Sequence, residues 1–374
     1  MRQELILKGL LLIGICSIKA SAQNQSMPHR ETLQLVSADS LEMRSQGSEE
    51  ILILHGKVKM VQGNAFLHCQ NATWWKSKER MLLLDDVHIF DGKRDLRADR
   101  VEYDGKTKSE RAQGHVQLEM NDRRLTADRV TYIQESEEIF AHGNIQFTDL
   151  IERATMIGDD SYYSRAQDYG WVKGESQIVK MDTASNDSMI VQGQQIEAWG
   201  KDQVFAVSDS VVLKKGALKA QCQYARYNSQ KEELRLENIP VLWHQNHEMK
   251  GDTITLKLKD LHFQGGTIQQ HAQIFSRDST TVNELKGQNI TVKASDDTIR
   301  AIHVQGQATS VYHIADKESQ EEGVNTVTGD YIVIYFKGDE IDRVSVESDP
   351  GTSTGTYTPK KKPVTPARSK NETS

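Results

Sequence analysis

The sequence predicts an all-β protein built from about ten stacked two-strand repeats. Three observations predict it. A short apolar pattern recurs ten times, a second segment with alternating apolar residues follows each copy at a nearly fixed distance, and no amphipathic helix of convincing length appears after residue 25. Recurrence at a period of roughly 20–50 residues is typical of repeat architectures. The chain has 374 residues, which is enough for one long array or for two domains.

The first half of each repeat combines four apolar or small positions. An apolar residue is followed by a small residue two positions later, and by apolar residues five and seven positions later, as in Leu96-Ala98-Val101-Tyr103. The first two positions and the last two have opposite parity, so a regular strand cannot place all four on one face. A bulge or corner between them would, because one extra residue reverses the alternation. The copies begin at Val36, Leu67, Leu96, Leu125, Met156, Val191, Ala220, Met249, Leu285 and Val327.

The second half of each repeat contains a matching special position. Asp99 is followed 15 residues later by Gly114, and apolar residues flank that glycine at alternate places. In other copies a glutamine takes the place of the aspartate, and Gln70 is followed at the same distance by Asp85. Alternation with period 2 indicates a half-buried strand. Polar turns such as Asp104-Gly105-Lys106 join the two strands. Ten breaks in one register predict a sheet that bends along one line around a continuous apolar interior.

The two ends of the chain have compositions unlike the repeats. Residues 1–22 resemble a cleavable secretory signal, with a short apolar stretch before Ala20-Ser21-Ala22, and residues 23–35 form a short N-terminal segment. We expect repeats over 36–240 and longer repeats over 241–357, in the same array or a second domain. Residues 358–374 are rich in lysine and proline and predict a disordered basic tail.

Composition excludes several classes of function. The net charge of −7 disfavours nucleic acid, whose binding is dominated by neutralisation of phosphates. Cys69 and Cys222 both fall in the small-residue position, but five repeats separate them, so we expect both to be buried and reduced. We find no glycine-rich phosphate loop, dinucleotide fingerprint or nucleophile elbow. The sequence therefore predicts no enzyme and no cofactor.

Histidines and paired acids are the residues that come nearest to a chemical site. His244 and His247 are close in sequence, but the spacing of a zinc site is absent, and they fall where a hairpin turn is expected. Asp85-Asp86 and Asp159-Asp160 occupy repeat positions, and Asp296-Asp297 lies in an expected turn. We predict structural roles for all of them, and no metal site.

The repeat resembles a known family. Leu-x-Ala-Asp-Arg-Val-x-Tyr, a short turn and Ala-x-Gly-x-Val-x-Leu, over residues 96–118, are similar to the OstA-like repeat of the LptA family of periplasmic lipopolysaccharide-transport proteins; residues 125–147 carry the pattern too. The register extends over roughly 36–350. No stretch resembles the membrane barrel of LptD or the membrane anchor of LptC, which share the repeat. The chain is longer than is usual for LptA, and its last three repeats are longer as well.

The resemblance implies a curved β-jellyroll in the periplasm whose interior shields the acyl chains of lipopolysaccharide. Expected partners are lipopolysaccharide, LptC-like and LptD-like proteins with the same repeat, and further copies stacked end to end. Exposed strands at the two ends of the array, near Val36–Met43 and Val344–Val346, would provide the docking edges by strand addition.

Alternation predicts which side chains face the interior and would contact lipid. The residues are Val101, Tyr103, Val116, Leu118, Val130, Tyr132, Ile145, Phe147, Val211 and Leu213. A second interpretation stays open, because a filled core demands the same apolar side chains as a lipid groove. In that case the chain is a structural or adhesive β-repeat protein without lipid.

Overall fold

The computed structural model describes residues 33–360, except 48, 93, 121, 152, 182–187, 260–261, 278–280, 296, 316–321 and 339. Every regular element in this part is a β-strand, and no helix that could cross a membrane occurs in it. The chain divides into two compact units, Met1–Leu236 and Glu237–Ser374. The signal peptide expected at 1–22 lies outside the described residues.

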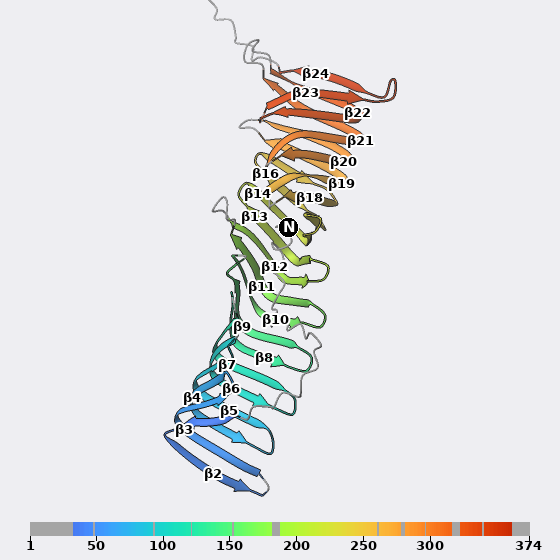
Figure 1. Ribbon diagram of the computed structural model, residues 1–374. Helices are drawn as coiled ribbons and strands as arrows, with labels where there is room; N and C mark the ends of the chain where they lie inside the picture. The colour runs from blue at the N-terminus through green and yellow to red at the C-terminus, as the bar shows by residue number, and fades with distance from the viewer. Residues whose placement is uncertain are drawn as a thin grey trace, which may run out of the picture. The chain divides into compact units, whose positions relative to one another are not determined.

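The first unit is a stack of long antiparallel strands in chain order (Figure 1). From β4 to β13 each strand pairs with the strand before it and the strand after it. The strands are β1 (Gln34–Ser37), β2 (Ser40–Gln46), β3 (Glu49–Gln62), β4 (Ala65–Trp75), β5 (Arg80–Phe90), β6 (Arg94–Asp104), β7 (Ser109–Met120), β8 (Arg123–Ile133), β9 (Glu138–Asp149), β10 (Ala154–Ser164), β11 (Tyr169–Met181), β12 (Ser188–Trp199), β13 (Val204–Lys215) and β14 (Leu218–Asn228), with β15 (Glu233–Glu237) at the boundary.

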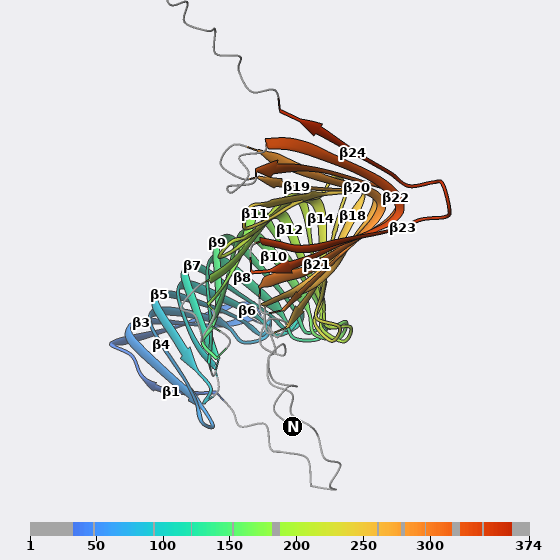
Figure 2. The same cartoon turned by 90° about the horizontal axis from the view of Figure 1, so that it is seen from above.

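The second unit continues the same construction with longer strands. β17 and β18 pair with the two halves of β19, and β19 to β22 then follow one another in order. Seen from above in Figure 2, β20, β21 and β22 bend at one side. The strands are β16 (Val241–His244), β17 (His247–Lys250), β18 (Thr253–Lys259), β19 (His262–Arg277), β20 (Val282–Ser295), β21 (Thr298–Ala315), β22 (Glu322–Lys337), β23 (Glu340–Glu347) and β24 (Thr354–Pro359).

The predicted corner is present in nearly every long strand. In the pairing of β6 with β7 the register shifts between Arg97 and Arg100, and the two residues of β7 opposite this shift, Gly114 and His115, have φ of 77° and 46°. The corners of other alternate strands also have two consecutive left-handed residues, among them Asp85-Asp86 of β5, Gly143-Asn144 of β9 and Asp209-Ser210 of β13. The left-handed pair gives β7 one residue more than β6 at the corner, so the alternation reverses in β6 and is kept in β7. The phase break in the sequence is therefore a bend in the backbone.

In the first unit, the corner also explains why aspartate faces glycine in some repeats and glutamine is matched with a larger residue in others. A Cβ added to Gly114 would lie 2.2 Å from Oδ2 of Asp99, so the short aspartate occupies the space that a side chain would need. Asp99 also accepts a hydrogen bond from His115 at 2.8 Å. Where glutamine replaces the aspartate, Gln70 reaches past the corner to accept from the backbone N–H of Lys57.

Each bent strand has two arms. In β6 and β7, arm A contains residues 100–104 and 109–113, beside the hairpin turn, and arm B contains residues 94–97 and 116–120; the corresponding residues of the other strands continue both arms. Along arm A, Val101 pairs with Ala112 and Ala112 with Val130; along arm B, Leu96 pairs with Leu118 and Leu118 with Leu125. All of these side chains are buried in one cluster, so the apolar faces of the arms pack on each other.

Hairpin turns stack on one another at the end of arm A. Glu79, Lys108 and Glu137 close successive turns in the left-handed region, with φ near 50°. The carbonyl of Glu79 accepts from the N–H of Gly105 at 2.8 Å, and that of Lys108 accepts from Gln134 at 2.9 Å. This second backbone ladder joins neighbouring repeats at the turn edge, in addition to the strand pairing.

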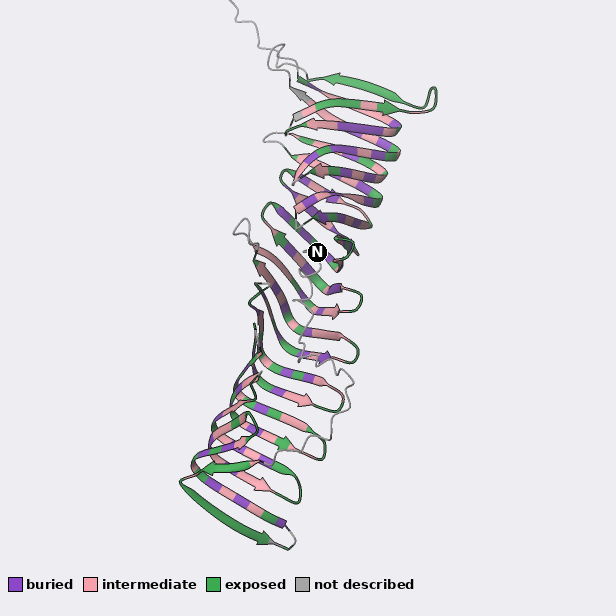
Figure 3. Ribbon diagram, viewed as in Figure 1, coloured by how far each residue is buried: buried purple, intermediate pink, exposed green. Residues whose placement is uncertain are grey.

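Buried and exposed residues alternate along the strands of Figure 3, and the strands at the two ends are mostly exposed. The two cysteines follow the prediction, since Cys69 and Cys222 are buried and neither forms a disulfide. Burial raises the pKa of the Cys69 thiol to about 11, so it remains protonated near neutral pH. The predicted tail begins too early, because Thr358 and Pro359 pair with β22 as part of β24; residues 361–374 lie outside the described part.

The corner rule leads to a testable prediction. Replacing Gly114 with Asp places a carboxylate against Asp99 and should lower the free energy of unfolding by about 2–3 kcal/mol, from crowding and like charge. Combining it with Asp99→Gln reproduces the Gln70–Asp85 pair and should restore about 1 kcal/mol or more. Urea unfolding of the single and double variants measures this coupling.

The control is Gly92→Asp, because Gly92 also has a positive φ, of 85°, but nothing lies within 4 Å of its added Cβ. It should show only the backbone cost, about 1 kcal/mol. Additive effects of Gly114→Asp and Asp99→Gln would contradict the corner rule.

Candidate functional site

The candidate site is the apolar interior between the two arms of the first unit. Seven of the ten residues predicted to face it are buried, with at most 6% of each exposed: Val101, Val116, Leu118, Val130, Ile145, Val211 and Leu213. They come from β6 to β9 and from β13, and their strands hold them by the alternation described above. Tyr132 and Phe147 are half-buried and pack against the same cluster. Lipid contact by these residues remains a prediction.

Tyr103 departs from the prediction. Its side chain is 42% exposed, although it has the parity of the interior positions. Tyr103 is the penultimate residue of arm A in β6, and its partner in β7 is Glu110 rather than an apolar residue. A tyrosine beside a charged neighbour at the end of an arm keeps its hydroxyl in water. Tyr103 therefore lies at the rim of the interior and not inside it.

An ion pair joins the two arms near this rim. Arg94, in arm B of β6, contacts Glu110, in arm A of β7, with Nη1 3.2 Å from Oε2. Both side chains are largely buried, at 23% and 17% exposed, and Nε of Arg94 lies 3.4 Å from Asp91. Sequence reasoning missed the pair, although its signal was present. Arg94 precedes Leu96 by two residues and Glu110 precedes Ala112 by two, so both charged side chains have the parity of the inward-facing residues.

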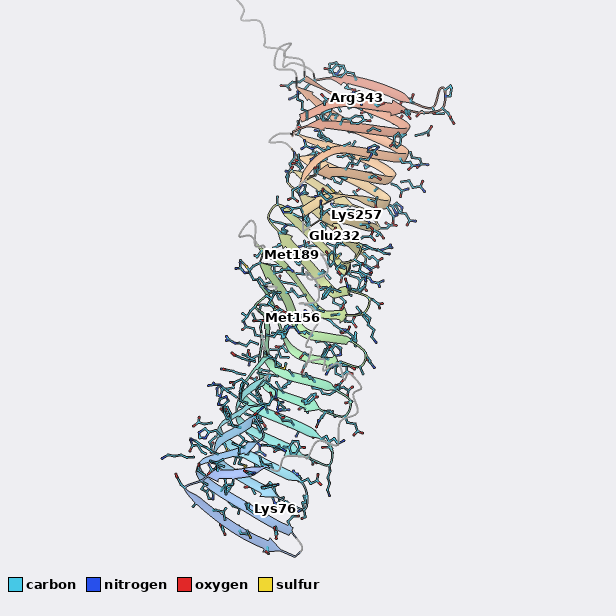
Figure 4. The ribbon with its side chains drawn as sticks, viewed as in Figure 1. Lys76, Met156, Met189, Glu232, Lys257 and Arg343 are labelled. Atoms are coloured by element: carbon cyan, nitrogen blue, oxygen red, sulfur yellow. The ribbon has the colours of Figure 1, made fainter. Side chains whose placement is uncertain are left out.

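Side chains of the protein itself fill most of the interior. A cavity in it has a volume of about 50 Å³ and is lined by Phe147, Met156, Tyr163, Trp171 and Ile196, among others; Figure 4 labels Met156. One water molecule needs about 10–15 Å³ of such space, so the cavity has room for a few waters and not for the several acyl chains of a lipid. Burial raises the pKa of Tyr163 to about 12, which keeps its hydroxyl protonated at this wall. Lipid could enter only if the arms moved apart.

The histidines and Asp297 have structural partners. His244 and His247 face each other across the β16–β17 hairpin, as expected. Nε2 of His244 donates to the carbonyl of Asp297 at 2.7 Å, and Nδ1 of His247 lies 2.7 Å from the Ser276 hydroxyl. Asp297 also accepts from Nδ1 of His262 at 2.7 Å. Within the described ranges, no three histidine, cysteine or acidic side chains gather as a metal site would require.

Comparison with known proteins agrees with the repeat. Residues 95–261 match the family described as LptA/(LptD N-terminal domain) LPS transport protein. The match covers less than half of the chain. The matched segment begins in β6, so it includes all ten predicted interior residues and the glutamate of the rim ion pair, and it ends two residues beyond β18. No curated protein is similar enough to the chain to count as a match.

One solved structure with a local likeness is LptH from Pseudomonas aeruginosa. It is described as the LptA-homologous periplasmic component of the conserved lipopolysaccharide transport device. The identity is 13% and the TM-score 0.22, over 39% of this chain and 82% of LptH. At that TM-score the fold assignment depends on the strand pairing of this chain and not on the likeness.

The rim ion pair provides a testable prediction. Glu110→Gln leaves the largely buried Arg94 without its partner across the arms, and should lower the free energy of unfolding by about 1–2 kcal/mol. Glu119 lies in β7 like Glu110, but its ion pair with Arg124 of β8 is exposed. Glu119→Gln should therefore change the free energy of unfolding by less than about 1 kcal/mol. Equal effects of the two substitutions in urea unfolding would show that the pair does not hold the arms together.

Proposed function

We propose that this protein is a non-enzymatic periplasmic carrier that shields the acyl chains of lipopolysaccharide between its two arms. The observation that carries the proposal is the continuous apolar cluster between the arms of β3 to β9, which lies partly within the segment of the transport family. The signal predicted at residues 1–22 supports the periplasmic location, where an exposed lipid must cross water.

The energetic need for such a shield is large. Each methylene exposed to water costs about 0.8 kcal/mol, so a lipid with several acyl chains cannot cross an aqueous gap at a useful rate without cover. An apolar face shared over many strands supplies many weak contacts in place of one tight pocket. Such contacts shield the cargo at every step and still allow it to move along the array.

Loading requires the arms to separate, because the closed interior holds a cavity of only about 50 Å³. Replacing contacts between the arms by contacts with lipid would lose little buried apolar surface. Leu118 and Val130 would lose contacts with other protein side chains and gain contacts with acyl chains of the same polarity. The remaining cost lies at the rim, where the Arg94–Glu110 pair must break or move aside. We infer that the rim controls entry of lipid from the side.

The filled interior is also the observation that favours the second candidate, a structural β-repeat protein without cargo. Such a protein would keep its arms closed, and its apolar columns would serve stability alone. The two candidates differ in whether lipid ever contacts the buried face of arm B.

Photo-crosslinking in cells separates them. A photoreactive amino acid at Val116, which is 1% exposed, should give lipopolysaccharide adducts if the arms open for cargo. The same amino acid at Gln117, the adjacent exposed residue of β7, should give none. Absence of adducts at 116 in protein whose strand content is normal by circular dichroism would favour the structural repeat.

The end strands are the proposed docking edges for further copies of this chain. β1 and β2 together cover β3, and β23 and β24 together cover β22, so each end presents two short strands, each with one paired edge among the described strands. Apolar side chains are exposed on them, including Val36, Met43 and Val344, at 60%, 58% and 45%. Free strand edges with apolar neighbours favour strand addition. LptC-like and LptD-like proteins with the same repeat are the corresponding partners at the two membranes.

Self-association tests this edge. Leu41, 51% exposed on β2, would be buried by an added strand, so Leu41→Lys should weaken association of the purified chain by about tenfold or more. Gln117→Lys adds the same charge to an outward position of β7 and should leave association unchanged. Sedimentation velocity measures both. A wild-type chain that stays monomeric at all concentrations would contradict end-to-end docking of copies.

A further inference from the structure

A second cavity lies mainly on the outward face of arm A and reaches the rim of the apolar interior at Met81 and Tyr103. Its volume is about 290 Å³, near the lower end of the roughly 300–1,000 Å³ typical of small-molecule sites. It spans five neighbouring strands, β4 to β8, beside their hairpin turns. The turn that contains Lys76, labelled in Figure 4, adjoins it through Trp75.

Three arginines from three strands line this cavity. They are Arg80 of β5, Arg100 of β6 and Arg111 of β7. Two carboxylates lie among them: Glu102, which is hydrogen bonded to Arg100, and Asp104, whose Oδ2 is 3.7 Å from Nε of Arg80. The cavity thus has one more cationic than anionic side chain, although the whole chain has a net charge of −7.

Arg111 is the cation in excess. Its side chain is exposed, and within the described part of the chain its guanidinium has no ion pair; its charge acts on Glu102 from a longer distance. The hydrogen bond from Arg100 holds the pKa of Glu102 below its ordinary value, and the charges of Arg100, Arg111 and Arg80 act in the same direction. Glu102 therefore stays ionised and keeps Arg100 in place, while Arg111 can turn to an incoming anion.

The remaining lining groups narrow the class of anion. Arginine binds phosphate oxygens with two parallel N–H donors, which makes a phosphate the best match for Arg111. Two carboxylates would repel a bare phosphate, but they accept hydrogen bonds from sugar hydroxyls. Ser109 and Thr131 add hydroxyl groups, and Trp75 and Tyr103 add aromatic surface at the wall. Aromatic surface suits the C–H faces of a sugar ring.

We propose that this cavity binds a phosphorylated sugar, with its phosphate on Arg111 and Arg80 and its hydroxyls on Glu102 and Asp104. The proposal of a sugar-phosphate site depends only on the lining of this cavity. That the sugar phosphate belongs to a lipid headgroup rests on the proposed carrier function. Tyr103, at the rim of the apolar interior and also in the lining of this cavity, makes the two sites neighbours.

Titration of the full mature chain with glucosamine 1-phosphate tests the site by isothermal calorimetry. Arg111→Gln should weaken binding by about tenfold, the loss of a charge-assisted hydrogen bond to phosphate. Arg80→Gln provides a second variant of the same site. Arg124→Gln is the matched control, because it removes one exposed arginine of β8 outside the cavity, and binding should stay within about twofold of wild type.

Two outcomes would overturn the proposal: no saturable binding by the wild type, or equal affinities of the wild type and Arg111→Gln. Binding of inorganic phosphate as tight as that of the sugar phosphate would overturn the assignment to a sugar. Circular dichroism confirms that the variants are folded, as expected for an exposed residue on an outward face.

Lipopolysaccharide, intact and enzymatically dephosphorylated, identifies the source of the sugar phosphate. If Arg111→Gln weakens capture of the intact lipid only, the ligand is its headgroup. If it weakens glucosamine 1-phosphate binding but leaves lipid capture unchanged, the site stands and its ligand is soluble. The lipopolysaccharide adduct at residue 116 tests the carrier function independently. Failure of the carrier function and failure of the sugar-phosphate site can therefore be told apart.

Discussion

The corner of the bent strands, with its left-handed pair in every second strand, is the constraint on which the rest of the structure depends. Without the corner, Leu96 and Val101 would point to opposite faces of β6, and no interior could form. With it, one strand contributes to both arms, and the two apolar faces meet. The corner in turn depends on the side chain opposite, since Asp99 leaves room only for a glycine at residue 114. Fold and interior are thus specified by a local packing rule that recurs along the chain.

The same geometry gives the molecule two kinds of surface along one arm. The inward face of arm A is apolar and closed, whereas its outward face has room for charged side chains such as Arg100 and Glu102. Since successive residues alternate between the faces, an apolar interior and a charged outer cavity can be built from the same few residues of β6. A lipid with apolar chains and a phosphorylated sugar presents the same division within one molecule.

Sequence reasoning found the elements that depend on periodicity. Parity placed Val116 and Ile145 inside, and the reversal of parity located the corner, because both follow from the period of a strand. Sequence reasoning failed where the exposure or the partner of a side chain depends on how far along an arm the residue lies. Tyr103 has the interior parity but lies at the rim, and Arg94 meets Glu110 only because the two arms fold onto each other. The size of the closed cavity depends on how far apart the arms settle, which no spacing in the sequence records.

Pairing between strands that are adjacent in sequence has a consequence for how the chain folds and how its length can change. From β4 to β13 every strand pairs with the strands immediately before and after it, so contacts are short in sequence and folding can propagate from any corner that forms first. Gain or loss of one whole repeat, by duplication or deletion in the gene, would add or remove about 10 Å of stack and leave every remaining strand with the same kind of neighbour. Repeat number can therefore be tuned to distance without redesigning the core.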